Sequence, residues 1–276
     1  MKVKFWGTRG SIPSPGKNTV KYGGNTTCVE VIPKNGKEII IDAGSGIRLM
    51  VDKIISEGIK EISLLLTHSH WDHIQGFPFF TPIYNDNFSL NIYGVSPTFE
   101  RLLDILKGQM DFIYWPVKFE HIGANVNFKK IDNSGISIDN VKINSIMTNH
   151  PLETHAFKFE ESGKVFIFMT DNELDHLHTA KVPYKKHLEF VKDADVLVHD
   201  AQYKKEEMKK FKGWGHSSWQ EVVSFAKKAG VKKLYLTHYD PDRNDLEVDK
   251  IIKEANKMAG DSLTVRGAIE GESFEI

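Results

Sequence analysis

His68-Ser69-His70-Trp71-Asp72-His73 is the stretch of sequence that decides how the rest of the chain is interpreted. It follows the apolar run Leu64–Leu66, which predicts a buried strand that ends where the motif begins. Two histidines that are two residues apart at a strand end can point to one side. The Asp-His pair lies just beyond, where the chain turns into a helix. We therefore expect the first pair to hold one metal ion and the second pair a neighbouring one. The alternative is a surface loop that is rich in histidine.

Four further apolar runs deliver a histidine or an aspartate at the point where each predicted strand ends. These residues are His150, Asp171, His199 with Asp200, and His238. A single histidine of this kind is more often a solvated or capped strand end than a ligand. Open α/β sheets, however, build their sites at the carboxyl ends of their strands. Five such strand ends together favour one shared site.

Composition limits both the metal ligands and the partners. The chain has 276 residues, of which 36 are Lys or Arg and 37 are Asp or Glu, so its formal net charge is -1. A strongly basic nucleic-acid binder is therefore excluded, and no stable nucleic-acid partner is expected. Twelve histidines stand beside one cysteine, Cys28, which we expect to be structural. A metal site must then draw on His, Asp and Glu, a donor set that suits Zn²⁺, with Mn²⁺ or Fe²⁺ as alternatives.

The alternation of short apolar runs with helical patterns predicts an α/β layered fold. Helices are expected over 45–59, from Ser96-Pro97 onward, from the capping box Ser218-x-x-Glu221 to Gly230, and over 246–258. Strands are expected at 38–42, 64–67, 141–148, 156–160, 165–169, 196–198 and 234–236. No linker rich in Pro, Gly or Ser interrupts the pattern, so we predict one domain over residues 1–276.

Targeting signals are not found in the sequence. The N-terminal residues reach Gly7 and Arg9 without an apolar segment, which argues against a signal peptide. No apolar run approaches the roughly 18 residues that span a bilayer. We therefore expect a cytoplasmic protein without a membrane partner.

The motif at 68–73 resembles the signature of the metallo-β-lactamase superfamily. Asp42, in Asp42-Ala43-Gly44, is similar to the first motif of that superfamily. His150, Asp171 and His238 are similar to its third, fourth and fifth motifs. The resemblance implies a four-layered αββα sandwich with a dinuclear metal site at one edge.

The resemblance also implies a ligand set for two divalent metal ions. One ion would be bound by His68, His70 and His150. The other would be bound by Asp72, His73 and His238. Asp171 would bridge the two. These seven residues are called the predicted ligands below.

Two later segments are similar to the ribonuclease Z and phosphodiesterase branch of the superfamily. They are His199-Asp200-Ala201 and Gly215-His216-Ser217-Ser218, where the branch carries His-Glu-Ala-Thr and then Gly-His-Ser-Thr or Gly-His-Ser-Ser. The resemblance implies that His216 donates a proton to the leaving oxygen and that Asp200 orients it. Asp200 stands where the branch has Glu, one methylene longer. The alternative for His216 is an ordinary residue before the Ser218 cap.

Substrate contacts are predicted in three places. The loop Phe5–Pro13 resembles the Gly-rich loop after the first strand of ribonuclease Z, and its Arg9 is expected to meet a phosphate or to be solvated. The aromatic segments 77–84 and 110–116 are candidates for a lid, with Tyr114 and Trp115 against the substrate. The alternative is that they belong to the core or to a dimer interface. Lys204–Lys212 is either a solvated face or a rim that attracts phosphate.

The remaining histidines are expected outside the ligand set. His121, His176, His178 and His187 are predicted at the surface. His155 is predicted near the mouth of the pocket, and His199 behind the ligands.

The functional prediction depends on the length of one interval. Residues 151–170 are all that separates His150 from Asp171, where ribonuclease Z carries a long tRNA-clamping arm. We therefore predict a phosphodiesterase that acts on a small phosphodiester, most favourably a cyclic nucleotide, with Asp72 orienting the attacking hydroxide as well as binding metal. The alternatives are a ribonuclease Z-like endoribonuclease, a thioesterase or lactonase on the same metals, and a binding protein without activity. A homodimer, common in the branch, is left open.

Overall fold

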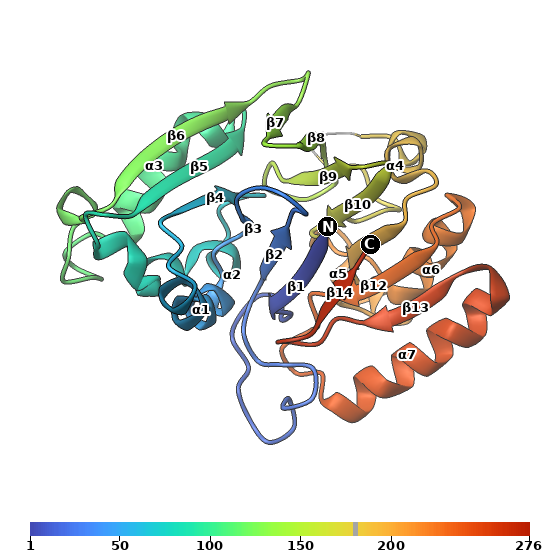
Figure 1. The fold of residues 1–276 in the computed structure, drawn as a ribbon. Coiled ribbons are helices and arrows are strands. Elements are labelled where there is room, and N and C mark those ends of the chain that lie inside the picture. The colour runs from blue at the N-terminus through green and yellow to red at the C-terminus, as the bar shows by residue number, and fades with distance from the viewer. Residues whose placement is uncertain (179–181) are drawn as a thin grey trace.

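The computed structural model describes residues 1–178 and 182–276. In these residues, two seven-stranded sheets lie face to face (Figure 1). In spatial order, the first sheet contains β14 (Ser273–Glu275), β1 (Lys2–Gly7), β2 (Cys28–Ile32), β3 (Ile39–Ile41), β4 (Glu61–Leu65), β5 (Ser89–Val95) and β6 (Asn125–Ile131). The second contains β13 (Thr264–Gly267), β12 (Lys233–Thr237), β11 (Val196–Asp200), β10 (Lys164–Met169), β9 (His155–Glu161), β8 (Val141–Met147) and β7 (Ile136–Ile138).

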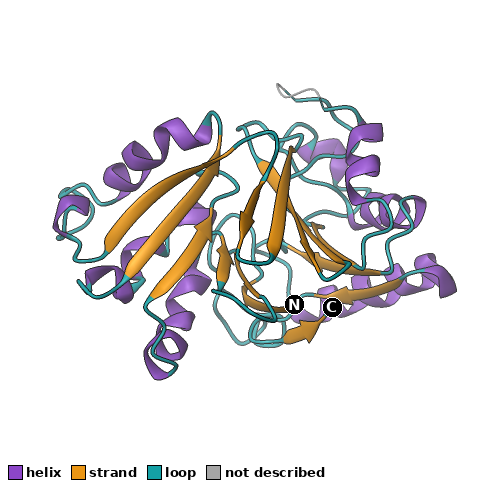
Figure 2. Ribbon diagram, turned by 45° about the horizontal axis from the view of Figure 1, so that its top comes forward, coloured by secondary structure: helices purple, strands orange, loops and turns teal. Residues whose placement is uncertain are grey.

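Helices cover the outer faces of the two sheets (Figure 2). Those beside the first sheet are α1 (Val51–Ser56), α2 (Trp71–Ile74) and α3 (Thr98–Gln109). Those beside the second are α4 (Tyr184–Val191), α5 (Met208–Phe211), α6 (Trp219–Lys228) and α7 (Asp245–Ala259). Short 3-10 turns are η1 (Ser45–Met50), η2 (Phe77–Phe79), η3 (Thr81–Tyr84), η4 (Phe119–His121) and η5 (Gly260–Ser262).

Three apolar clusters account for the layers. Ile39 and Ile41 of β3 enter the cluster between the sheets, together with Phe166 of β10, while Ile40 enters the cluster under the helices of the first sheet. A third cluster joins α6 and α7 to the second sheet. Because successive side chains of a strand point to opposite faces, the continuous apolar runs are those of strands buried on both sides. The predicted four-layered αββα sandwich is confirmed.

Local signals set most helix boundaries. The Ser218 hydroxyl accepts from the Glu221 amide at 3.4 Å and the Glu221 carboxylate accepts from the Ser218 amide at 3.0 Å, so the predicted capping box is confirmed. The helix expected over 45–59 is shorter, because Gly58 with φ 65° follows η1 and α1. Ser96 does not cap α3: Pro97 occupies that position, and the Ser96 hydroxyl donates to Glu100 instead.

The topology brings polar strand ends to one edge of the sandwich. β3 runs parallel to β4, and β10, β11 and β12 run parallel to one another. The residues that follow these strands therefore leave each sheet on one side, which is where the histidines and aspartates of the motifs gather. Among the described residues, none of the helices combines the length and the apolar character that crossing a bilayer requires.

Candidate metal centre

The predicted ligands converge as two triads. The ligand atoms of His68, His70 and His150 lie within 4.8 Å of one another. Those of Asp72, His73 and His238 form a second group within the same limit. These groups match the two sites that the sequence implies, and each combines loops from the two sheets.

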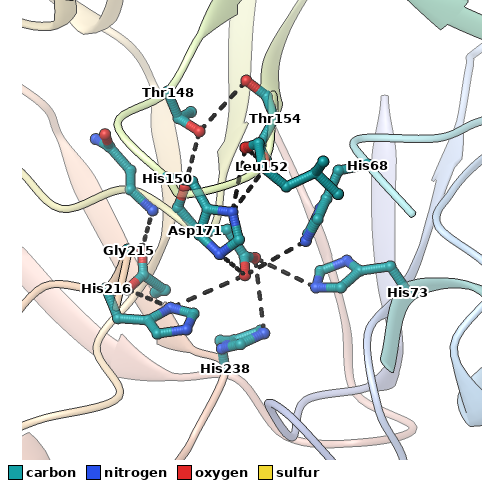
Figure 3. Close-up of polar contacts among 12 residues, drawn as sticks. His68, His73, Thr148, His150, Leu152, Thr154, Asp171, Gly215, His216 and His238 are labelled. Atoms are coloured by element: carbon teal, nitrogen blue, oxygen red, sulfur yellow. Dashed lines mark hydrogen bonds and ion pairs between the residues drawn. The ribbon is translucent and has the colours of Figure 1, made fainter. Parts of the chain in front are cut away.

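Asp171 lies between the triads and turns one oxygen toward each (Figure 3). Its Oδ1 is 3.9 Å from Nε2 of His68 and 3.6 Å from Nε2 of His150. Its Oδ2 is 3.3 Å from Nε2 of His73 and 3.6 Å from Nε2 of His238. A carboxylate that divides its oxygens in this way has the arrangement that bridging two cations requires.

The donor atoms that face this centre fit a pair of metal ions. In the described part of the chain, Nε2 of His68, Nε2 of His73 and Oδ2 of Asp171 are buried without a hydrogen-bond partner. Buried polar atoms are rarely left unpaired, because each such atom costs about 1–3 kcal/mol. Although burial opposes it, the carboxylates of Asp72, Asp171 and Asp42 raise the pKa of His73 well above its usual range. This excess of negative charge is what divalent cations would neutralise.

Asp42 directs the ring nitrogens of both triads. Its Oδ2 accepts from Nδ1 of His73 at 2.7 Å and from the Thr67 hydroxyl at 2.9 Å. Since Thr67 donates its only hydroxyl proton to Asp42, its oxygen accepts from Nδ1 of His68, which lies 3.1 Å away. His68 then carries its proton on Nδ1 and turns the lone pair of Nε2 to the centre, and His73 would do the same once a cation displaces the proton of its Nε2.

His150 and His238 are held in the same manner by other partners. Nδ1 of His150 donates to the Leu152 carbonyl at 3.3 Å and lies 3.2 Å from the Thr154 hydroxyl. Nδ1 of His238 is 3.0 Å from Oε1 of Gln202. Burial lowers the pKa of His150 to about 3, so that its ring is neutral and its Nε2 can bind a cation.

The N-terminal loop closes the centre from one side. The Ser11 amide donates to Oδ2 of Asp72 at 2.7 Å, and that oxygen is also 3.1 Å from Nε2 of His238. A Cβ on Gly10 would lie 2.3 Å from Nδ1 of His238, so only glycine permits this approach. Ser11 was not predicted as part of the site, and neither were Gln202 and Thr154.

Backbone strain is concentrated at this centre. Ser11, Asp42, Asp171 and His238 are non-glycine residues with φ of 63°, 62°, 57° and 57°. Such conformations cost about 1–3 kcal/mol each and persist where the surrounding structure enforces them. The fold therefore stores strain in the loops that present the ligands.

His216 lies beside both triads. Its ring centroid is 5.6 Å from that of His150 and 5.0 Å from that of His238. The structure brings Asp200 next to it, but Oδ2 of Asp200 is 3.7 Å from Nδ1 of His216, which is too long for a hydrogen bond. Asp200 instead accepts from the amides of Ser217 at 3.0 Å and Asn172 at 3.2 Å.

His150, Asp171 and His216 also form a group that could hold a metal ion, a use of His216 that the sequence did not suggest.

The predicted role of Arg9 is wrong. Its guanidinium is fully buried, with Nε donating to the Gly23 carbonyl at 2.8 Å and Nη1 to the Arg243 carbonyl at 2.7 Å. Burial lowers the pKa of Arg9. The side chain therefore ties the N-terminal loop to the segment that follows His238 and does not face a substrate.

The two aromatic segments that were predicted as a lid divide between the core and the surface. Phe77, Phe80 and Ile83 are fully buried in the core under the first sheet's helices. Trp115 packs on Phe79, with ring centroids 4.7 Å apart, and its indole N–H donates to a tyrosine hydroxyl. Tyr114 is 73% exposed. Within the described residues, no hydrogen bond or ion pair joins Tyr114 or Trp115 to the predicted ligands.

The other histidines divide into exposed and buried ones. His121 is exposed as predicted, whereas His176 and His178 are partly buried. His187 was expected at the surface but is buried, with Nε2 2.9 Å from the Met147 carbonyl. His155 is buried rather than at a pocket mouth, and burial lowers its pKa to about 4.

Comparisons with known proteins identify the family of the chain and solved structures with a similar fold. The family described as "Beta-lactamase superfamily domain" matches residues 37–239. A ribonuclease Z from Oceanobacillus iheyensis is 21% identical over 303 residues, which covers 94% of this chain and 95% of the relative. Among solved structures, the metallo-beta-lactamase fold protein YhfI from Bacillus subtilis has a TM-score of 0.72 and 18% identity over 99% of this chain and 98% of its own. The short form of human tRNase Z has a TM-score of 0.68 and 19% identity over 100% of this chain and 99% of its own.

Proposed function

Since the chain belongs to the beta-lactamase superfamily, we propose that it is a metal-dependent phosphodiesterase that hydrolyses a small phosphodiester, most favourably a cyclic nucleotide. The family match and the relatives confirm the resemblance to the metallo-β-lactamase superfamily and to its ribonuclease Z and phosphodiesterase branch. The choice of reaction and substrate is supported by the arrangement of the chain's own side chains.

One observation carries the choice of reaction. His216 lies beside the two triads that could hold cations, and its ring centroid is 5.0 Å from that of His238. A thioester expels a thiolate that departs without a proton, whereas a phosphodiester with an alkoxide leaving group gains from a further acid. A phosphodiesterase therefore accounts for His216, and a thioesterase does not.

The residues would divide the work as follows. The two triads and Asp171 would hold two divalent ions, for which Zn²⁺, Mn²⁺ and Fe²⁺ all fit the donors. When bound, such ions activate water and offset charge on the phosphate. Asp72, fixed by the Ser11 amide at 2.7 Å, orients the attacking water.

The hydrolytic step balances without a co-reactant. The water oxygen forms a bond to phosphorus while the P–O bond to the leaving group breaks with its electron pair. The ring of His216 gives a proton to the leaving oxygen and later recovers one from solvent. The proton that water loses passes to Asp72 and then to solvent.

The size of the substrate is inferred from the interval between His150 and Asp171. There β9 and β10 form a hairpin through a turn that contains Ser162 and Gly163, with φ of 52° and 75°. This hairpin has no room for a long arm that clamps RNA. A ribonuclease Z-like activity is the second candidate, because relatives with that name align over 94% or more of this chain.

The test is a substrate screen on protein reconstituted with Mn²⁺ or Zn²⁺. It compares 3′,5′- and 2′,3′-cyclic nucleotides, cyclic dinucleotides, RNA and the general probe bis(p-nitrophenyl) phosphate. We expect metal-dependent turnover of a small diester. Failure to hydrolyse any of them with any metal would overturn the proposal, and efficient cleavage of RNA alone would favour the second candidate. A His216→Ala variant that keeps full activity on thioesters but not on phosphodiesters supports the role given to His216.

A further inference from the structure

A buried glutamate that is not one of the predicted ligands accepts hydrogen bonds from the backbone of the loop that carries His216. Glu173 is 1% exposed, and its Oε1 accepts from the Gly213 amide at 2.9 Å. Its Oε2 accepts from the Gly215 amide at 3.0 Å and lies 2.9 Å from Nε2 of His178. The Glu173 carboxylate therefore accepts from two amides of the loop and faces one imidazole.

The loop needs this acceptor because of its shape. Gly213 and Gly215 have φ of 87° and 90°, a region that favours glycine. A Cβ on Gly215 would lie 2.1 Å from Cδ2 of His150, so the backbone packs directly on the ring of a predicted ligand. Gly215 is buried and Gly213 is partly buried, and their amides, which are outside any helix or strand, require another acceptor. A charged acceptor gives hydrogen bonds about twice as strong as a neutral one.

A second set of hydrogen bonds holds the residue that follows His216. The Ser217 hydroxyl donates to the Asn172 carbonyl at 2.6 Å and accepts from the Leu174 amide at 3.1 Å. Segments 172–174 and 213–217 are therefore joined both before and after His216. Nδ1 of His216 itself is buried and makes no hydrogen bond with the described residues. The direction of its ring consequently depends on how the backbone is held.

We propose that Glu173 is a positioning residue for His216, acting through the Gly213 and Gly215 amides. This inference rests on the proposed function, because its consequence is the transfer of a proton from His216 to the leaving oxygen. Glu173 touches neither substrate nor reacting atoms. Misplacing a catalytic group by about 1 Å can cost on the order of 100-fold in rate, so a loosened loop is expected to impair catalysis.

The test compares Glu173→Gln with Glu206→Gln, a matched control at an exposed glutamate of a nearby segment. Glutamine offers one carbonyl oxygen and sets an NH₂ group against the remaining loop amide. The probes are bis(p-nitrophenyl) phosphate, whose leaving group departs without a proton, and diphenyl phosphate, whose leaving phenol has a pKa of about 10. We expect kcat of E173Q to fall about tenfold or more on diphenyl phosphate and less than about twofold on the nitrophenyl diester, with KM unchanged.

A second readout does not depend on activity. Amide hydrogen exchange of the peptide that spans 212–217, measured without and with metal, is expected to become faster in E173Q and to stay unchanged in E206Q. Metal content, measured by mass spectrometry, is expected to equal that of the unmodified protein. If E173Q does not fold, Glu173→Asp, which keeps the charge, takes its place with a smaller expected effect of the same kind.

The outcomes separate this inference from the proposed function. Unchanged hydrogen exchange, or an equal loss on both diesters, overturns the role of Glu173. If the unmodified protein hydrolyses neither diester, the proposed function fails instead. In that case, faster exchange at 212–217 in E173Q would still show that Glu173 holds the loop, but the proposed effect of this contact on catalysis would be refuted.

Discussion

Two fully buried aspartates lie behind the centre, one at the end of a strand of each sheet, and they accept hydrogen bonds from different groups. Asp42 follows β3 and accepts from Nδ1 of His73 at 2.7 Å and from Thr67. Asp200 ends β11 and accepts from the backbone amides of Ser217 and Asn172. The first therefore fixes side chains that would bind metal, and the second fixes loops that carry other groups to the centre.

This difference indicates how the site divides its tasks. Loss of Asp42 would leave the tautomers of His68 and His73 unset, because one carboxylate serves both rings. In the described part of the chain, Asp200 has no hydrogen bond to the side chain of a predicted ligand, so its loss would act on the loops rather than on the ligand rings. For Asp200, burial opposes ionisation, but His199 and His216 hold its pKa below the usual range, so it stays charged. We expect metal binding to depend on Asp42 and catalysis to depend on Asp200.

The largest expected effect is that of the metal itself. Removing it with a chelator leaves buried donors and an excess of carboxylates unpaired, so Zn²⁺ or Mn²⁺ is expected to stabilise the fold. At a thousandfold excess over Kd, the gain is about 4 kcal/mol, visible as a rise in Tm by calorimetry. If no divalent ion shifts the Tm, the metal centre is refuted, and so is the contrast between Asp42 and Asp200 that depends on it.

The next effect distinguishes the two aspartates by affinity. We expect Asp42→Asn to weaken metal binding by about 10–100-fold, because an amide oxygen that accepts from His73 and the Thr67 hydroxyl leaves an NH₂ group against the Thr67 amide, which Oδ1 of the carboxylate now accepts at 2.8 Å. Isothermal titration of the metal-free protein measures this, with Asp52→Asn at an exposed position as the control. An affinity equal to that of the control would show that Asp42 does not hold the ligands.

Asp200→Asn is expected to have the reverse pattern. Metal affinity should stay within about twofold of the unmodified protein, while kcat on diphenyl phosphate falls about tenfold, because the loop that bears His216 loses a charged acceptor. Asp261→Asn, at an exposed position, is the control. If Asp200→Asn loses metal as Asp42→Asn does, the division between the two aspartates is wrong.

The sequence predicted the parts of this site that come directly from strand ends. Apolar runs followed by His or Asp indicate where a strand stops, and parallel strands bring those ends together, so the seven predicted ligands converge as expected. Arg9 could not be placed in the same way. An arginine in a Gly-rich loop has the same local pattern whether it meets a phosphate or, as here, the carbonyls of Gly23 and Arg243.

Hydrogen-bond partners of the ligands that come from distant segments of the chain were not predicted, for a related reason. Gln202 and Ser11 occupy ordinary sequence contexts, and only the tertiary fold brings them to His238 and Asp72. His187 was expected at the surface, but it is one of the residues that α4 buries. Glu173 gave no signal, since its partners are backbone amides about 40 residues away.

The smallest expected effect compares two threonines that contact ligand histidines. The Thr67 hydroxyl donates to Asp42 and accepts from Nδ1 of His68, so it links that ring to the carboxylate. Nδ1 of His150, by contrast, has two neighbours, the Leu152 carbonyl and the Thr154 hydroxyl. Replacing Thr67 by Val removes the acceptor of His68, worth about 1 kcal/mol or roughly fivefold in metal affinity. Thr154→Val should change that affinity by less than about twofold, because Leu152 still accepts from His150. The two variants have the same change in volume, so a difference in titrated affinity reports the relay. Equal losses would mean that the hydroxyls matter only through packing, and that Asp42 acts on His73 alone.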